Sequence, residues 1–183
     1  ALSNNNKNTM VVGSPRHDKF FNFVDNVEKK GIILFAPNFP HLMSSKNITT
    51  EAIETFNEFI QQTCKILKNI PNKEFIVKPH PTQSAVYDIA KLVKDVDHDI
   101  SITYEQNILN VISKCDLVIT TNNSTVAIDS MMLNKPVISL QTKSNYMNDE
   151  IVKMGAVISV TKISDIESTI KKLIKDNAMK KDL

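Results

Sequence analysis

Glycine is scarce in this chain: its 183 residues include three, Gly13, Gly31 and Gly155. Dinucleotide-binding loops and Walker-type loops need closely spaced glycines, because only glycine lets the backbone approach a phosphate so closely. Glycines this far apart exclude both motifs. Any phosphate that the protein binds must therefore be held by something other than a glycine-rich turn.

Cysteine is also scarce, and tryptophan is absent. The two cysteines, Cys64 and Cys115, are far apart and form no C-x-x-C pair. This pattern predicts buried, small apolar side chains in a reducing compartment, not a disulfide or a reactive thiol.

An excess of charge of one sign and a long apolar run are missing too. The formal net charge is +2, which gives no reason to expect binding to nucleic acid. The longest apolar runs, such as residues 31–36, have the length of a strand, and a membrane-spanning helix needs about 20 residues. No charged leader followed by an apolar segment opens the chain, so we expect no secretory signal and a cytoplasmic protein. The chain begins with Ala and a polar stretch at 3–8, which suggests a piece of a longer protein.

From residue 31 onward, short apolar runs alternate with helical patterns. The run 32–36, closed by Pro37, is typical of a strand covered on both faces. We expect strands at 32–36, 74–78, 100–104, 117–120, 136–140 and 157–160, and helices at 50–67, 84–94, 108–112, 163–175 and from the polar stretch 121–125 to 133. This alternation predicts an α/β fold with a doubly wound, mostly parallel, six-stranded Rossmann-like sheet.

Two units are expected along the chain. Residues 1–30 are interpreted as an N-terminal connecting segment, with a strand at 9–12 and a helix at 18–27. Residues 31–183 form the Rossmann-like domain. No internal repeat is evident.

Ligands of open α/β sheets bind beyond the carboxyl ends of the strands, where the helices begin. One such position holds Lys78-Pro79-His80-Pro81, directly after a strand. The two prolines fix the backbone around His80 in an extended turn. An imidazole held there could donate a hydrogen bond, or a positive charge, to a phosphate or a leaving group. A proline-rich turn whose histidine bonds a neighbouring carbonyl is an equally good interpretation.

A second position holds Asn122-Asn123-Ser124-Thr125, between a strand and a helix. Helix starts have unpaired N–H groups and partial positive charge, which suit a phosphate, and two hydroxyls add donors. The plainer interpretation is that Ser124 is an ordinary helix N-cap. Asp129 lies one turn farther along, where its carboxylate could meet a ribose or face solvent.

Other chemistries have little support in the sequence. No G-x-S-x-G elbow exists, and no Ser-His-Asp order can be assigned. The histidines are scattered and none makes an i, i+4 pair with another ligand type, so no metal site is predicted. The four are His17, His41, His80 and His98.

Two segments together resemble a known group of proteins: 75–81, which reads FIVKPHP, and 117–129, which reads LVITTNNSTVAID and leads into 133–138, LNKPVI. They are similar to the C-terminal, donor-nucleotide-binding domain of GT-B glycosyltransferases. The group includes CDP-glycerol glycerophosphotransferases, bacterial polysialyltransferases and capsule transferases, which pair an His-Pro motif with a later Ser/Thr pair. The resemblance covers roughly residues 10–176, and Gly13-Ser-Pro-Arg-His-Asp18 is similar to the group's leading segment.

The resemblance implies a transferase of surface polysaccharide synthesis that uses a nucleotide-activated donor of the CMP, CDP or UDP type as its substrate, with no separate cofactor. His80 would be catalytic, contacting the donor phosphate and assisting the leaving group. The donor phosphates and nucleotide would be bound by Lys78, His80, Asn123, Ser124, Thr125 and Asp129. An acid commonly precedes the hydroxyl pair in the teichoic-acid enzymes, and Asn122 and Asn123 stand here instead, so the donor type stays open.

Two alternatives remain at this point. UDP-N-acetylglucosamine 2-epimerases share the architecture, but they carry a Ser-Gly-Gly turn and a Glu-Glu pair where this chain has Ser124-Thr125-Val126 and a lone Asp129. A nucleotide-binding or scaffold domain without turnover is the other alternative. For a transferase, the resemblance implies an N-terminal acceptor domain in the parent chain and allows peripheral association with the inner membrane face.

Overall fold

The computed structural model describes residues 13–21, 31–38, 49–81, 88–105, 107–122, 124–141 and 150–175. Six strands in these ranges form one sheet in the order β3-β2-β1-β4-β5-β6. They are β1 (Ile32–Ala36), β2 (Glu74–Val77), β3 (Ser101–Ile102), β4 (Cys115–Thr121), β5 (Val137–Leu140) and β6 (Ile158–Val160). Every pairing is parallel, so the predicted Rossmann-like sheet is confirmed.

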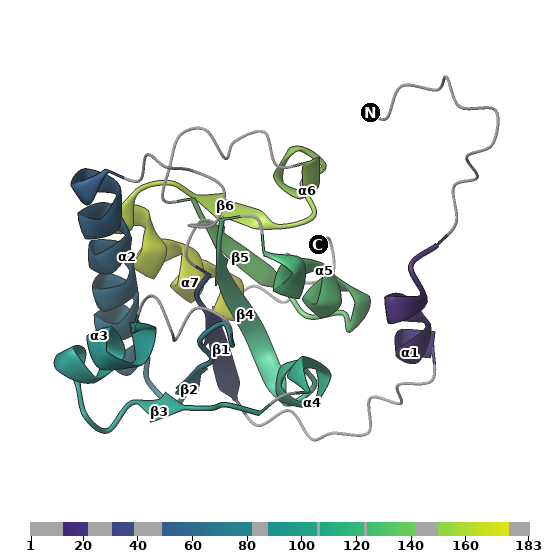
Figure 1. Ribbon diagram of the computed structural model, residues 1–183, viewed down its shortest axis with the longest axis horizontal. Helices are drawn as coiled ribbons and strands as arrows, with labels where there is room; N and C mark the ends of the chain where they lie inside the picture. The colour runs from purple at the N-terminus through teal and green to yellow at the C-terminus, as the bar shows by residue number, and fades with distance from the viewer. Residues whose placement is uncertain are drawn as a thin grey trace.

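Helices cover both faces of this sheet (Figure 1). One face carries α2 (Thr50–Lys68), α3 (Ile89–Val96) and α7 (Ile166–Lys175), whose apolar side chains pack with those of the central strands. The other carries α4 (Ile108–Ile112) and α5 (Thr125–Met132), and α6 (Glu150–Lys153) packs beside α5. Short 3₁₀ turns, η1 (Pro15–His17) and η3 (Ile163–Asp165), precede α1 (Asp18–Phe21) and α7.

The central strands are apolar on both sides because both faces are covered. All five residues of β1 are buried. The long helix α2 shows the complementary pattern, with one apolar stripe toward the sheet. Its buried residues are Phe56, Phe59, Ile60, Thr63, Cys64 and Leu67, as the spacing predicts. Thr49 caps its start, accepting a hydrogen bond from the Ala52 N–H at 3.2 Å.

Several boundaries differ from the expected ones. β3 has two residues where five were expected, because it lies at the edge of the sheet and pairs with β2 alone. Helix α3 begins at Ile89, where the Asp88 carboxylate accepts from the Lys91 N–H at 2.8 Å, and residues 84–87 of the expected helix lie outside the described residues. The four-residue α6 was not predicted, since so short a helix leaves no periodic pattern.

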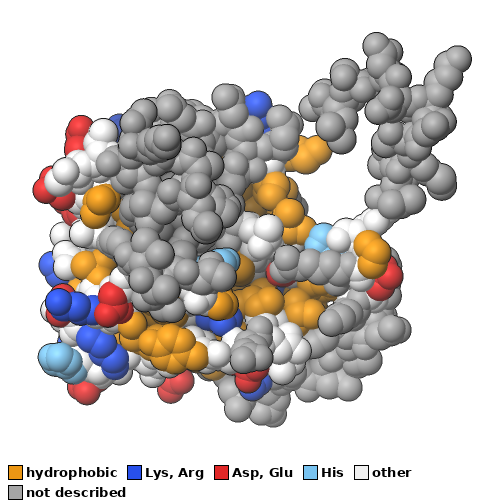
Figure 2. Space-filling model, in the orientation of Figure 1, with side chains coloured by type: hydrophobic (Ala, Val, Ile, Leu, Met, Phe, Trp, Pro, Cys, Tyr) orange, Lys and Arg blue, Asp and Glu red, His pale blue; other side chains and the backbone are white. Residues whose placement is uncertain are grey.

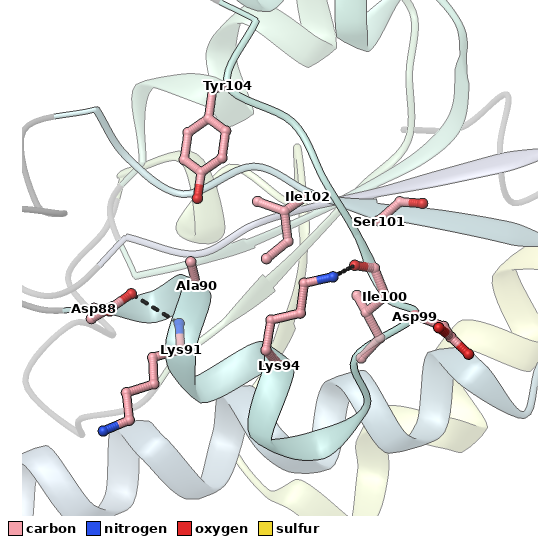
Figure 3. Close-up of a pocket in the computed structure, with 9 residues that line it drawn as sticks. All are labelled: Asp88, Ala90, Lys91, Lys94, Asp99, Ile100, Ser101, Ile102 and Tyr104. Carbon is pink, nitrogen blue, oxygen red and sulfur yellow. Dashed lines mark hydrogen bonds between the residues drawn. The ribbon is translucent and has the colours of Figure 1, made fainter.

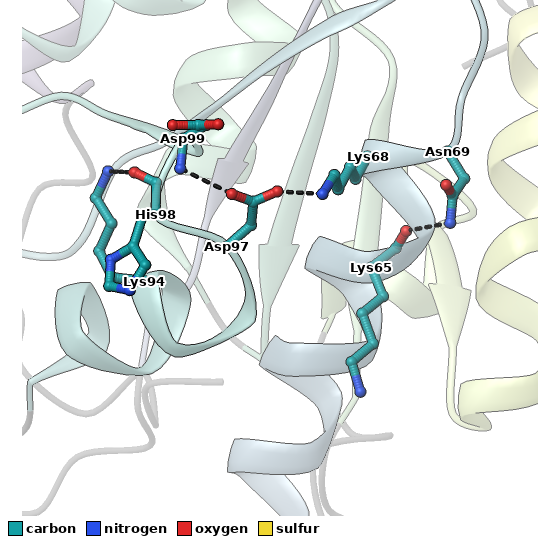
Figure 4. Close-up of polar contacts among 7 residues, drawn as sticks. All are labelled: Lys65, Lys68, Asn69, Lys94, Asp97, His98 and Asp99. Carbon is teal, nitrogen blue, oxygen red and sulfur yellow. Dashed lines mark hydrogen bonds and ion pairs between the residues drawn. The ribbon is translucent and has the colours of Figure 1, made fainter.

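The ends of α2 and α3 are joined by polar contacts (Figure 4). The Lys68 ammonium forms an ion pair with Asp97, and the second carboxylate oxygen of Asp97 accepts from the Asp99 N–H at 2.8 Å. Hydrogen bonding to Asp97 raises the pKa of Lys68, and the bond from Lys68 lowers the pKa of Asp97. These contacts hold α2 and α3 together at the end of the sheet opposite the candidate site.

The surface carries no strong excess of one charge in the view of Figure 2, where basic and acidic side chains are interspersed over α2 and α3. Within the described part of the chain, no helix is both long and apolar enough to cross a membrane.

Candidate functional site

The strand order places a switch point between β1 and β4. From β1 the sheet continues through β2 to β3 on one side, and from β4 through β5 to β6 on the other. In such sheets, ligands bind at the carboxyl ends of the strands beside the switch point. Lys78 and His80 follow β2, and Ser124 and Thr125 follow β4, so the predicted site residues lie at this edge. Only β1 separates the two strands, about 10 Å at two strand spacings.

The segment after β2 continues the strand before it turns away. The Lys78 N–H donates to the Phe35 carbonyl at 2.8 Å, which extends the ladder to β1 by one bond. Pro79 is buried and His80 is exposed. The prolines on both sides of His80 deny it a helical course, so its position is set by the backbone.

The turn from β4 into α5 depends on Asn122. Its φ is 50°, in the left-handed region that Asn and Asp tolerate better than other residues with a side chain. The Asn122 carbonyl accepts from the Ser124 N–H at 3.0 Å and from the Ser139 hydroxyl at 3.2 Å. An asparagine is therefore well suited to this turn.

Ser124 is the N-cap of α5, so the plainer interpretation of this residue is confirmed. Its hydroxyl accepts from the Val126 N–H at 3.3 Å, and the residue is buried. Thr125, the first residue of the helix, is exposed. Asn123, which the resemblance also assigns to the donor, lies outside the described residues.

Asp129 does not face solvent. It is 1% exposed, and its Oδ1 lies 3.9 Å from Nε2 of His17 in η1. The His17 ring also meets Phe20 edge-on, with 5.7 Å between ring centroids. The segment 13–21 is thus attached to α5, a contact that the sequence analysis missed. His17 and Asp129 are 112 positions apart, and no sequence pattern predicts contact between residues so far apart.

Two further polar contacts tie the strand ends together at this edge. The Thr121 hydroxyl donates to the Asn38 carbonyl at 2.7 Å and accepts from the Asn38 N–H at 2.7 Å. The Ser139 hydroxyl of β5 donates to the carbonyl of Asn122, directly after β4, at 3.2 Å and accepts from the Gln141 amide at 2.8 Å. Together they fix the carboxyl ends of β1, β4 and β5 relative to one another, which a phosphate site at a sheet edge requires.

Lys78 is a buried basic residue at this edge, with 7% of its surface exposed. Burial lowers the pKa of its ammonium, and the attraction of Glu105 in the loop after β3 partly offsets this effect. A buried basic group with a lowered pKa beside a ligand-binding edge is a common property of functional sites.

A hollow with a volume of about 620 Å³ lies elsewhere, along the outer side of β3 (Figure 3). There the Lys94 ammonium donates to the Ile100 carbonyl at 2.8 Å. It lies beyond β3, on the far side of β2 from the switch point. Among the described residues, no group of three or more His, Cys, Asp or Glu could hold a metal ion.

Comparison with known proteins shows to which family the chain belongs. A family model described as LIC12162 family transferase matches residues 3–153, which is most of the sequence. The chain belongs to this family of transferases. No curated protein matches it.

Solved structures confirm the fold of this LIC12162 family member. The rhamnosyltransferase SpnG, which acts on spinosyn, is 13% identical with a TM-score of 0.58 over 85% of this chain and 40% of its own. The C-terminal domain of the glycosyltransferase LpcC from Francisella tularensis is 17% identical with a TM-score of 0.51, over 92% of this chain and 86% of that domain. The UDP-GlcNAc 2-epimerase from Neisseria meningitidis, bound to UDP-GlcNAc, is 19% identical with a TM-score of 0.55, over 87% and 40%.

These likenesses show that the chain has the fold of the C-terminal half of a GT-B glycosyltransferase. It spans 40% of the length of SpnG. Because transferases and an epimerase share this fold, the fold alone does not separate the two activities. The family whose model matches the chain is described as a family of transferases.

Proposed function

We propose that the chain is the donor-binding half of a glycosyl- or polyol-phosphate transferase that uses a nucleotide-activated donor in surface polysaccharide synthesis. The observation that carries the proposal is the placement of His80 and of the Ser124-capped start of α5 at one sheet edge, on either side of β1. Such an edge suits an anion held between two strand ends.

In this proposal the first turn of α5 binds a donor phosphate. N–H groups of the helix start and the hydroxyls of Ser124 and Thr125 donate to its oxygens, and the helix dipole favours the negative charge. His80 donates a hydrogen bond to the leaving phosphate and, when protonated, a positive charge that stabilises it. Asp129, which contacts His17, would lie behind this first turn of α5, where its carboxylate could meet the donor ribose.

The GT-B fold indicates where the acceptor would bind. Its active site lies between two halves, so the acceptor would be bound by an N-terminal domain of the parent protein. We place the reaction in the cytoplasm, with the enzyme at the inner membrane face. The proposed transfer uses no separate cofactor, because the activated donor itself carries the leaving nucleotide.

Turnover by the parent protein tests this function. Release of nucleotide from CMP-, CDP- and UDP-linked donors would be measured for the wild type, His80→Ala and His98→Ala, the last an exposed histidine far from the site. We expect one donor class to turn over, His80→Ala to lower the rate by about 100-fold or more, and His98→Ala to leave it unchanged. Nucleotide binding without turnover of any donor would instead support the scaffold alternative.

A further inference from the structure

The start of α5, which the proposed function assigns to a donor phosphate, has a buried carboxylate close behind it. Asp129 is 1% exposed and lies four residues after Thr125, on the same face of the helix. Because helix side chains lean toward the N-terminus, this carboxylate lies about one turn behind the exposed Thr125 side chain. A buried negative charge so close to the helix start opposes the binding of a phosphate there, since like charges repel and burial limits screening.

An imidazole from the leading segment of the chain lies against this carboxylate. Nε2 of His17 is 3.9 Å from Oδ1 of Asp129, and 28% of the His17 side chain is exposed. The His17 ring contacts the ring of Phe20 edge-on, with 5.7 Å between centroids, and Phe20 is 9% exposed. His17 ends the 3₁₀ turn η1, which begins at Pro15, a residue with a fixed φ. Local structure therefore holds the imidazole in place beside α5.

A protonated imidazole at this distance offsets the negative charge of Asp129, because opposite charges a few ångströms apart attract strongly where little water lies around them. The neighbouring carboxylate, Asp18 of α1, is exposed, so water and salt screen its charge. With His17 protonated, the N–H groups and the dipole of α5 act on a phosphate with less opposing charge behind them. A neutral side chain at position 17 would leave the carboxylate charge one turn from the bound phosphate.

A purely structural role for His17 makes a different prediction. A histidine that only attaches the segment 13–21 to α5 would act through its ring and its contact with Phe20. Its effect on nucleotide binding would then not depend on the charge of Asp129, and another positive side chain could not replace it. A histidine that offsets the carboxylate charge acts on the ligand through Asp129, so its effect disappears when that charge is removed.

We propose that His17 is a positioning residue of the donor site, which offsets the charge of Asp129 and thereby raises the affinity of the start of α5 for the donor phosphate. This inference rests on the proposed function and goes further, because it gives a role in donor binding to a segment that precedes the first strand of the sheet.

A double-mutant cycle tests the proposal. The 183-residue chain would be titrated calorimetrically with CMP, CDP, UDP and GDP at pH 6, in the acidic part of the range in which histidines titrate. The proteins are the wild type, His17→Gln, Asp129→Asn and the double variant. We expect His17→Gln to weaken binding of the preferred nucleotide about fivefold or more, and to have no effect once Asp129→Asn is present. A ribose contact of Asp129 does not disturb this comparison, because Asp129→Asn removes it from both proteins of the second pair.

A charge-retaining variant provides a second measurement with Asp129 intact. His17→Lys keeps a positive charge at this position, so it should bind the nucleotide within about twofold of the wild type, whereas His17→Gln should not. His98→Gln is the matched control, the same substitution at an exposed histidine far from α5, and should leave the affinity unchanged. Melting curves of all variants show which of them fold. If Asp129→Asn does not fold, the comparison of His17→Lys with His17→Gln decides the question.

Three results would overturn the role of His17. They are equal nucleotide affinities of the wild type and His17→Gln, a loss in His17→Gln that His17→Lys does not restore, and the same loss with and without Asp129→Asn. If the wild type binds none of the four nucleotides, the proposed function itself is contradicted, which is a different result.

Discussion

His80 and Ser124 lie at the same edge of the sheet, but removing them should have different consequences. His80 is exposed and its backbone is fixed by prolines, so His80→Ala should leave the melting temperature unchanged. It should weaken nucleotide binding about tenfold or more, the value of a hydrogen bond to a charged group. Titration and melting of the same samples measure both quantities. A lower melting temperature with unchanged affinity would make His80 a structural residue.

Ser124→Ala is expected to act on stability first. The hydroxyl accepts from the Val126 N–H, and losing an N-cap costs about 1 kcal/mol whether or not a phosphate is bound. Denaturant unfolding would measure this loss. Thr125→Ala is the matched control, because Thr125 is exposed and is not the capping residue. Equal stability of the serine variant and the wild type would contradict the capping role.

The two cysteines offer a residue-scale prediction that does not involve a ligand. Cys64 and Cys115 are free and buried, and burial raises the pKa of each thiol to about 12. Because the thiolate is the reactive form, neither should react with a disulfide reagent at pH 8 in the folded protein. Both should react once the protein is unfolded in denaturant. Rapid modification of either thiol under native conditions would contradict their placement in the core.

Residue type and position along the chain were enough to place His80 and Ser124 at the carboxyl ends of two strands, because each comes shortly after an apolar strand run. The His17–Asp129 contact and the burial of Lys78 could not be predicted. Both depend on which segments meet in space, and lysine is usually solvent-exposed. The sequence left two roles open for Asp129, and the structure excludes the solvent-facing one.

At the scale of elements, the stabilisation that the Lys68–Asp97 contact gives to α2 and α3 should depend on pH. The bond from Lys68 lowers the pKa of Asp97 in the folded protein. The stabilisation is therefore present above the unfolded pKa of the carboxyl, and is lost as the pH falls through the lower folded value. Asp97→Asn should melt at a lower temperature than the wild type near pH 7, and this difference should vanish in acid.

Melting curves from pH 2 to 7 would measure this difference, which is small for an exposed ion pair. Asp95→Asn is the control, an exposed carboxylate of the same helix. A difference between the wild type and Asp97→Asn that stays constant over the whole range would show that the ion pair does not stabilise the contact.

Long elements with a periodic apolar pattern were predicted with nearly correct ends. The ends of short elements were not predicted correctly. Helix α2 was expected at 50–67 and extends over Thr50–Lys68, because its apolar stripe spans many turns. Strand β3 was expected to be longer, since an edge strand is shortened by the absence of a second neighbour and not by its own residues. The 3₁₀ turn η3 at the start of α7 and the helix α6 were both missed, because elements of three or four residues leave no periodic pattern.

For the whole molecule, the sequence predicted six strands and a parallel sheet, and both are confirmed. It did not predict the strand order. The order matters for function, because it places β1 between the histidine loop and the start of α5. Two loops that are more than 40 positions apart in the sequence thereby lie on either side of β1, and the donor-binding proposal depends on this arrangement.

Nucleotide binding by the chain tests the central claim most directly. The melting temperature would be followed with CMP, CDP, UDP and GDP, and with the nucleosides cytidine and uridine as controls without phosphate. Saturation at about 100 times the dissociation constant stabilises a folded protein by about 2.7 kcal/mol, which is about 5–10 °C for a chain of this size. The account predicts such a rise with at least one nucleotide and a smaller one with its nucleoside. A melting temperature that none of the four nucleotides raises would contradict it.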